Sequence, residues 1–279
     1  LVERLLFDGT RCIGVRFWHK GKQQDILAGK DIILSAGAIG SPAILQRSGI
    51  GPAKLLRSHG IDVIADRAGV GANLQDHLEV YFQIACTQPI TLYKHLNFFS
   101  KALIGARWLF FSSGLGASNQ FETVGFIRSD KEIPYPDIQY HFLPVAIRYD
   151  GTAPAEGHGF QLHVGSMRSK SRGHVHITGQ HASDKPEIRF NYLSHPDDLP
   201  EFRKAIRLSR EILAQTAMAP YYGGEIQPGS DQTSDEQIDA FIRREAESAY
   251  HPCGTCKLGA VDDTMAVVAP DCHVIGTQN

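Results

Sequence analysis

The sequence has no excess of charge of either sign, few cysteines and no long apolar run. It has 28 Lys and Arg against 30 Asp and Glu, a formal net charge of −2. A phosphate backbone would have little positive charge to attract it, so no nucleic-acid partner is expected. Five cysteines, an odd number in a chain of this length, predict reduced thiols in the cytoplasm and no disulfides.

The longest apolar stretches are too short to cross a membrane. Residues 102–111 are interrupted by Gly105 and Arg107 and fall short of the roughly 20 residues that a spanning helix needs. Peripheral attachment to a membrane, such as the inner membrane, stays open. The first residues lack an initiator methionine, carry Glu3 and Arg4 within an apolar run, and do not resemble a signal peptide. We therefore expect an N-terminus that has been cut.

The composition is otherwise that of a globular protein with a sizeable core, because 42% of the 279 residues are hydrophobic and 21% are charged. Two strands separated by an Asp8-Gly9 turn predict a hairpin. The apolar run 31–35, which ends in small residues, predicts a fully buried strand. Ser41 and Pro42 predict the start of a helix that extends through Gln46.

Further along the chain, alternating polar and apolar residues predict half-buried antiparallel strands in a second, sheet-based layer. Three helices are predicted from apolar periodicity and, for the last, from the capping-box spacing of Thr233 and Glu236. The strands of the initial hairpin are expected at 1–7 and 12–18, the later strands at 78–85, 137–143, 161–167 and 173–178, and the helices at 94–112, at 197–215 and from about Thr233.

Three blocks of sequence carry a family resemblance. Residues 37–51 read GAIGSPAILQRSGIG and resemble the second signature of the glucose-methanol-choline (GMC) oxidoreductases. Residues 70–77 resemble the family's VGxNLQDH segment, and residues 250–259 its HPxGT segment. Three blocks in the family's order identify the chain as a member. The sequences of residues 116–119, 139–144 and 163–169 most resemble those of family members that oxidise choline.

The resemblance implies a mixed α/β fold with two kinds of domain. Residues 1–77 would form part of a Rossmann-like FAD-binding domain. Residues 78–230 would form a substrate-binding domain with a large antiparallel sheet backed by helices. Residues 231–279 would return to the FAD-binding domain with the catalytic histidine. The resemblance also implies FAD as the cofactor and a quinone or another acceptor for the electrons.

His251 is the predicted catalytic residue. Oxidation of an alcohol by hydride transfer requires the hydroxyl proton to be removed or shared, and an imidazole can accept it near neutral pH. Most of the 13 histidines would be surface or hydrogen-bonded core residues. His251 stands apart because relatives carry their active-site base or alkoxide stabiliser at the matching position.

The substrate and cofactor residues are carried over from the resemblance. A quaternary ammonium group cannot donate an N–H hydrogen bond, so its site should offer aromatic faces and a carboxylate. Glu122 matches a glutamate that faces this group in choline-oxidising relatives, and His141 matches a histidine that bonds the substrate oxygen. A solvated carboxylate and a core histidine are the ordinary alternatives. Ala249 and Tyr250 complete the predicted substrate contacts.

Contacts with FAD are expected at the backbone of Val2 and at Ser35, Ala36 and Gly37. A strand that ends in small residues lets the backbone approach a flat cofactor, and the following helix start offers unpaired amides. Cys253 and Cys256 form a CxxC that in isolation would suggest a redox dithiol or half a zinc site. No second pair follows at zinc-ribbon spacing, so we predict packing residues and no metal.

The sequence also lacks parts that relatives have. A Gly-x-Gly-x-x-Gly fingerprint for the FAD pyrophosphate and the Asn or His that partners the catalytic histidine are both missing. We therefore expect this polypeptide alone to be inactive, and the intact enzyme to oxidise choline to betaine aldehyde. Two alternatives stay open: a GMC dehydrogenase for another small alcohol, and a flavin-free remnant that binds a quaternary amine.

Overall fold

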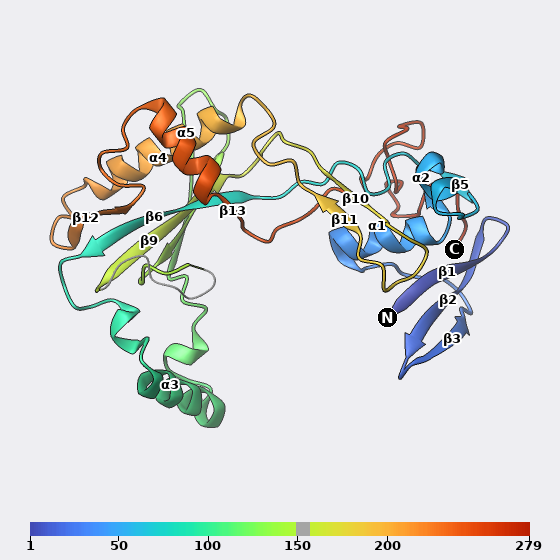
Figure 1. Ribbon diagram of the computed structural model, residues 1–279, viewed down its shortest axis with the longest axis horizontal. Coiled ribbons are helices and arrows are strands. Elements are labelled where there is room, and N and C mark those ends of the chain that lie inside the picture. Colours follow the sequence, from blue (N-terminus) through green and yellow to red (C-terminus); the bar gives the residue numbers. More distant parts are fainter. Residues whose placement is uncertain (149–156) are drawn as a thin grey trace. The chain divides into compact units, whose positions relative to one another are not determined.

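The computed structural model describes residues 1–148 and 157–279 as two compact units (Figure 1). Unit 1 comprises residues 1–76, 171–194 and 250–279, and unit 2 comprises residues 77–170 and 195–249. Each unit is thus assembled from separate stretches of the chain. The predicted ranges assigned residues 171–194 to the substrate-binding domain and residues 231–249 to the FAD-binding domain. In the structure, residues 171–194 lie in unit 1 and residues 231–249 in unit 2.

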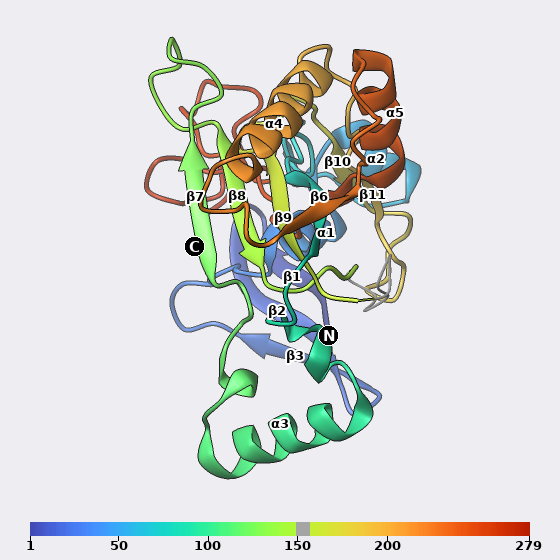
Figure 2. The ribbon, with the colours of Figure 1, turned by 90° about the vertical axis from the view of Figure 1, so that its left-hand side faces the viewer.

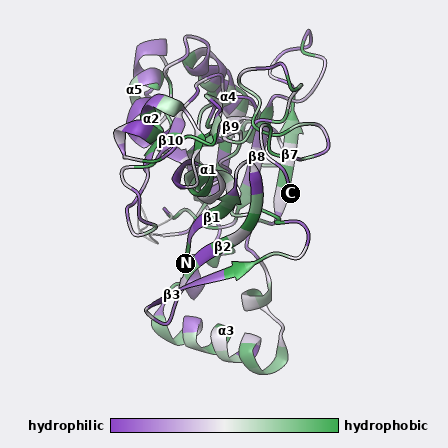
Figure 3. Ribbon diagram, turned by 90° about the vertical axis from the view of Figure 1, so that its right-hand side faces the viewer, coloured by the Kyte–Doolittle hydropathy of each residue, from purple (hydrophilic) through white to green (hydrophobic). Residues whose placement is uncertain are grey.

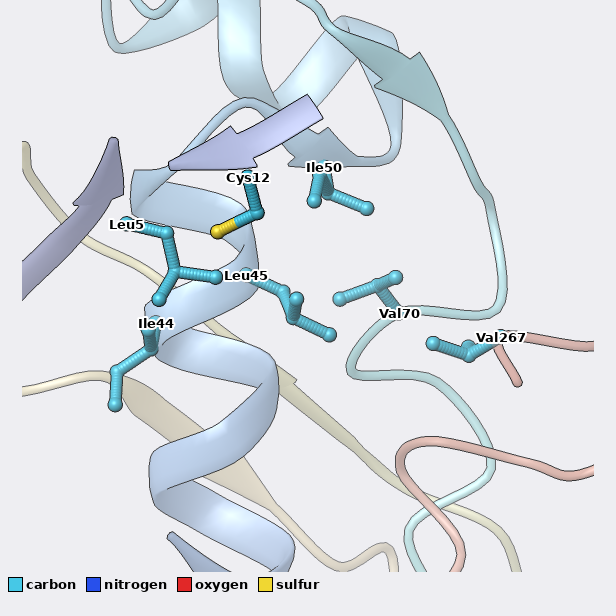
Figure 4. Packing of buried hydrophobic residues seen from close by; sticks show 7 residues of the cluster. All are labelled: Leu5, Cys12, Ile44, Leu45, Ile50, Val70 and Val267. Carbon is cyan, nitrogen blue, oxygen red and sulfur yellow. The ribbon is translucent and has the colours of Figure 1, made fainter. Parts of the chain in front are cut away.

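Unit 1 begins with the predicted hairpin, extended by one strand. Strands β1 (Val2–Asp8), β2 (Arg11–His19) and β3 (Lys22–Leu27) form an antiparallel sheet in that order. Helix α1 (Gly37–Arg47) packs against β1. Leu5 and Cys12 from the sheet join Leu45 of α1 and Val70 in a buried apolar cluster (Figure 4). This cluster fixes α1 against the sheet.

The predicted buried strand at 31–35 is wrong. No strand forms there, and the Ile33 side chain is 88% exposed, although Ile32 and Leu34 pack on the cluster of unit 1. A strand requires a hydrogen-bonded neighbour, and within the described residues none pairs with this segment. The apolar run predicted burial, but it could not indicate whether a neighbouring strand would pair with it.

The start of α1 also differs from the prediction. The helix begins at Gly37, with Pro42 inside it, and not at Ser41. Ser41 lies in the second turn, and its hydroxyl accepts a hydrogen bond from the amide of Ala36, the residue before the helix, at 3.0 Å. Pro42 lies in the second turn and cannot donate to the Ala38 carbonyl four residues before it. That carbonyl accepts a hydrogen bond from the Thr255 hydroxyl instead, at 2.6 Å.

The remaining elements of unit 1 are short. Strand β4 (Ile50–Gly51) pairs in parallel with β5 (Ala65–Asp66), and α2 (Ala53–Ser58) lies between them in the sequence. Strand β10 (His174–His176) confirms the strand predicted at 173–178. It pairs with β11 (Glu187–Arg189) in a separate two-stranded sheet, and so does not extend the sheet of unit 2.

Unit 2 is built on a six-stranded antiparallel sheet (Figure 2). Its main path runs β12 (Tyr222–Gln227), β6 (Leu78–Cys86), β9 (Gly159–Ser166), β8 (Ile138–Leu143) and β7 (Thr123–Ile127), and β13 (Glu247–Ser248) pairs with β6. The strands predicted at 78–85, 137–143 and 161–167 are confirmed as β6, β8 and β9. They occupy neighbouring positions because β6 pairs with β9 and β9 with β8.

One face of this sheet is apolar and covered by a helix. Helix α4 (Asp198–Leu213) has Phe202, Ala205 and Ile206 fully buried and contacts β9. The buried Tyr140 hydroxyl donates to the Ala205 carbonyl at 3.1 Å, which ties α4 to β8. The predicted helix at 197–215 is therefore confirmed.

Two further helices complete unit 2, with 3₁₀ turns at Leu92–His95 and Leu115–Ala117 on either side of the first. Helix α3 (Phe98–Phe111) confirms the prediction at 94–112. Helix α5 (Asp235–Glu245) has its capping box one residue later than predicted, because Ser234 and Gln237 form it. Among the described residues, no helix combines the length and the apolar character that crossing a bilayer requires.

Candidate active site

His251 lies in unit 1 between two residues, Tyr250 and Gly254, whose φ angles are positive. Tyr250 before it has a φ of 61°, a left-handed conformation that is uncommon for residues other than glycine. Gly254 after it has a φ of 92°, and a Cβ there would lie 2.5 Å from the Asn73 carbonyl oxygen. Glycine is thus required at the centre of the HPxGT segment.

The HPxGT segment is held by the VGxNLQDH segment. Gln75 and Cys253 exchange two backbone hydrogen bonds of 2.9 Å each. The buried carboxylate of Asp76 accepts a hydrogen bond from the His251 backbone N–H at 2.8 Å and another from the Tyr192 hydroxyl at 2.5 Å. Asp76 is therefore a positioning residue for His251. Sequence reasoning quoted it as part of a motif but gave it no role.

The same segment is also tied to the start of α1. The buried Thr255 hydroxyl donates to the Ala38 carbonyl at 2.6 Å, and the Thr255 carbonyl accepts from the Gly71 amide at 2.9 Å. Thr255 thereby links the three motif blocks, which are far apart in the sequence. The predicted cofactor residues immediately precede Ala38.

The predicted cofactor residues leave their backbone accessible. Ser35, Ala36 and Gly37 are exposed, and a Cβ added at Gly37 would meet no atom within 4 Å. The helix starts without a side-chain cap, so its first amides can receive polar ligand atoms. These features fit a flat, anionic cofactor lying against the bend.

Val2 lies apart from that bend, at the start of β1. Its carbonyl accepts a hydrogen bond of 3.5 Å from Arg47, and its side chain packs on the apolar cluster. A cavity of about 620 Å³ is lined by parts of β1, β2 and the end of α1, including Glu3, Arg16 and Arg47. Neither His251 nor the bend at 35–37 lines this cavity.

Glu122 and His141 lie in unit 2 at one edge of the sheet. The Glu122 amide donates to the Phe142 carbonyl at 3.2 Å, immediately before β7. Val124 pairs with His141 in register, so the two-residue period places Glu122 on the same face as His141. The Phe121 ring contacts the His141 ring edge-on, with centroids 5.7 Å apart. An aromatic ring, an imidazole and a carboxylate thus gather here.

Beside the half-buried His141, the same face continues with two buried polar side chains to which sequence reasoning gave no role. Tyr81, His163 and His141 are cross-strand partners on β6, β9 and β8. His163 is 3% exposed; its Nδ1 lies 2.7 Å from Glu79 and its Nε2 2.6 Å from Gln161. A signal was available, since Glu79, Tyr81 and Gln83 alternate with apolar residues in β6, as Gln161 and His163 do in β9. That alternation indicated a solvated face, and burial could not be read from it.

Ala249 and Tyr250 fall on either side of the division between the units. The Ala249 amide donates to the His77 carbonyl at 2.8 Å within unit 2. Tyr250 belongs to unit 1 and is 73% exposed. Their predicted role in substrate binding remains a prediction, as do the roles of Glu122, His141 and His251.

All five cysteines are free thiols. Cys253 is exposed, whereas burial raises the pKa of the Cys256 thiol to about 11. A thiol with so high a pKa is a poor nucleophile near neutral pH. The buried Cys256 thiol fits the predicted packing role better than a redox dithiol, whereas Cys253 is exposed and does not pack.

Curated relatives match the whole chain. The oxygen-dependent choline dehydrogenase of Brucella anthropi is 58% identical over 278 residues, which cover 100% of this chain and 51% of that protein. The oxygen-dependent choline dehydrogenase of Stenotrophomonas maltophilia is 54% identical, with coverage of 100% and 50%. The chain therefore spans about half the length of these relatives.

Solved structures match its fold. Pyridoxine 4-oxidase from Mesorbium loti has a TM-score of 0.83 and 29% identity, covering 100% of this chain and 50% of that one. Formate oxidase from Aspergillus oryzae has a TM-score of 0.89 at 24% identity, with coverage of 99% and 53%, a likeness in fold alone. Models described as GMC oxidoreductase match residues 1–79 and residues 169–279. The chain belongs to the GMC oxidoreductase family.

Proposed function

We propose that the protein containing this chain oxidises choline to betaine aldehyde with FAD as the hydride acceptor. The observation that carries this proposal is the anchoring of His251: Asp76 binds its backbone, and Thr255 ties its segment to the exposed bend before α1. GMC oxidoreductases are FAD-dependent flavoenzymes, and the curated relatives named above are choline dehydrogenases.

His251 would take the hydroxyl proton. Oxidation removes a hydride from the alcohol carbon and a proton from the oxygen, leaving the aldehyde. Bound FAD supplies the hydride acceptor. An imidazole accepts a proton near neutral pH and stabilises a developing alkoxide. Because Asp76 and Gly254 fix the backbone on both sides of His251, the ring can be presented without a large loss of entropy.

Glu122 and His141 would recognise the substrate. The trimethylammonium group of choline needs a negative charge and aromatic surface, and Glu122 with the neighbouring Phe121 provides both. His141 bonds the Gln139 side chain, with nitrogens 2.8 Å apart. That bond orients the imidazole, which can then contact the substrate oxygen. Ala249 and Tyr250 would add contacts.

Ser35, Ala36 and Gly37 would lie against FAD, and the Val2 backbone would contact its adenine. Electrons must then leave the protein. The relatives are named oxygen-dependent choline dehydrogenases, so oxygen is one acceptor that we propose and a membrane quinone is the other. A cytoplasmic location, with peripheral contact to the inner membrane, suits a quinone.

Helix α3 supports such a contact. Most of its apolar side chains are exposed, including Phe99 at 82% and Phe111 at 76%, and Lys101 and Arg107 are its only charged residues. Figure 3 shows hydrophobic colour at both ends of α3. Aromatic and basic residues on one helix favour the interface of an anionic membrane.

The membrane contact is tested by sedimentation with vesicles. Vesicles containing phosphatidylserine should carry the protein down, and neutral vesicles should do so less. Phe110→Ser with Phe111→Ser should release it. Sedimentation unchanged by this double variant would exclude α3 as the contact.

The substrate proposal is tested by charge recognition. Glu122→Gln should raise the KM for choline at least about tenfold, which corresponds to about 1.4 kcal/mol. It should change little for the alcohol in which a tert-butyl group replaces trimethylammonium. Glu132→Gln, at another exposed glutamate, is the control. Equal effects on both alcohols would favour a GMC dehydrogenase for another substrate.

A further measurement separates an enzyme from a flavin-free binder. FAD added to the purified protein should produce the flavin visible spectrum after removal of free cofactor. Choline-dependent thermal stabilisation without that spectrum would instead indicate a remnant that only binds the amine.

A further inference from the structure

Two imidazoles and a carboxylate meet on one face of the small sheet in unit 1. His174 and His176 are two residues apart on β10, so both point to the same face. Glu187 on β11 pairs directly with His176, which places its side chain on that face as well. The three residues come from two strands joined by residues 177–186.

The donor atoms lie close together, though somewhat farther apart than the ligands of a bound zinc ion. One ligand atom from each residue lies within 4.8 Å of the other two. His174 Nε2 and Glu187 Oε2 are 3.7 Å apart, too far for a hydrogen bond. Two ligands of a tetrahedral zinc, each about 2.0 Å from it, are about 3.3 Å apart. A small closing movement would therefore bring all three onto one ion.

The strand that carries the histidines is held rigidly from its other face. Val175 between them is fully buried, and its amide donates to the Gly71 carbonyl at 2.7 Å. The buried side chain of Gln46 donates to the Val175 carbonyl and accepts from the Ile177 amide, both at 2.9 Å. The histidine rings are stacked, with centroids 4.1 Å apart. The two imidazoles would therefore lose little conformational freedom when a ligand binds.

We propose that His174, His176 and Glu187 bind one divalent transition-metal ion of borderline softness, with zinc as the best match. Two imidazoles and one carboxylate suit this class, and water would complete the coordination. The histidines are half-buried and Glu187 is exposed, so an ion can enter from solvent. The site would clasp β10 to β11. It reverses the prediction that the chain holds no metal.

Arg189 limits the affinity. Its guanidinium donates to Glu187 Oε1 at 2.9 Å, and it pairs with His174 across the sheet. Its positive charge opposes a cation at the site, while Glu187 Oε2 remains directed toward His174. Removing the charge of Arg189 should therefore strengthen binding, which an ordinary structural ion pair would not predict.

The test is a zinc titration of the tag-free, chelator-treated protein, followed by calorimetry and by metal analysis after dialysis. One equivalent should bind. His176→Asn and Glu187→Gln should each weaken binding at least about tenfold, and Arg189→Gln should tighten it. His19→Asn removes an exposed imidazole elsewhere and should leave binding unchanged. Magnesium should not compete.

Absence of saturable zinc binding below about millimolar concentration would overturn the proposal, as would unchanged affinity in Glu187→Gln. Weaker binding in Arg189→Gln would also contradict it. Circular dichroism checks the fold of each variant, and the opposite effects of the Glu187 and Arg189 variants decide the matter if His176→Asn misfolds. Choline and FAD are not involved, so the proposed function stands or falls separately.

Discussion

Asp76 gives the sharpest prediction, because one buried carboxylate binds both His251 and Tyr192. Asp76→Ala removes the acceptor of the His251 N–H. A hydrogen bond to a charged group contributes about 1.5–3 kcal/mol. The opening free energy at this amide should fall by that amount, so hydrogen exchange there should speed up about 10- to 150-fold. Local exchange is the right readout, because a chain of two compact units need not unfold in one step.

Exchange measured by mass spectrometry on peptides that cover residues 248–256 would show the effect. Asp262→Asn, at an exposed aspartate of the same unit, is the control and should leave these peptides unchanged. Tyr192→Phe removes the hydroxyl that donates to Asp76 but keeps the acceptor of the His251 N–H, so it should alter exchange at the His251 amide much less. Acceleration below about threefold in Asp76→Ala would refute the view that this carboxylate positions the catalytic segment.

Other groups give independent predictions. Iodoacetamide near neutral pH should alkylate the exposed Cys253 far faster than Cys256, whose pKa burial raises to about 11; equal rates would contradict this. Burial raises the pKa of Tyr140 from 10.0 to about 12, so its absorbance should not titrate until the pH approaches that value. Because folding raises the pKa of Tyr140, the neutral hydroxyl stabilises the folded protein. This contribution to the free energy of unfolding is complete below the pKa of Tyr140 in the unfolded chain and is lost as the pH rises toward its pKa in the folded protein. His163→Ala removes a partner of the buried Glu79 and should lower the free energy of unfolding by about 2–4 kcal/mol in urea denaturation; a loss below about 0.5 kcal/mol would count against the network.

Local sequence patterns predicted many of the strands and helices. The alternation in β6, β8 and β9 predicted strands, and the apolar stripe of α4 predicted its helix, because each element buries one face within unit 2. The segment at 31–35 failed, since a buried strand depends on neighbours that no local pattern specifies. The prediction that α1 starts at Ser41 was wrong for a related reason. The Ser41 hydroxyl accepts a hydrogen bond from the Ala36 amide, five residues earlier, and so it does not cap a helix that begins at Ser41.

The candidate site shows the same division. His251 was found from the HPxGT motif, and Asp76 belongs to a second quoted motif, VGxNLQDH. The positioning role of Asp76 depends on the hydrogen bond from the His251 amide, 175 residues away, and Tyr192, which also bonds this carboxylate, is 116 residues away. Sequence spacing could not indicate either contact. His163 and Glu79 were read as parts of ordinary strands, because polar alternation looks alike on a solvated face and on a buried polar one. Long-range hydrogen bonding, and not composition, distinguishes the two.

The central claim is that His251 takes the substrate proton in a flavin-dependent oxidation. Rapid mixing of choline with the anaerobic, flavin-loaded protein that contains this sequence measures this step as the loss of flavin absorbance. Choline should bleach the wild-type flavin, and His251→Asn should slow the bleaching about 10²- to 10⁴-fold with the flavin still bound. Bleaching at the wild-type rate in His251→Asn would contradict the claim.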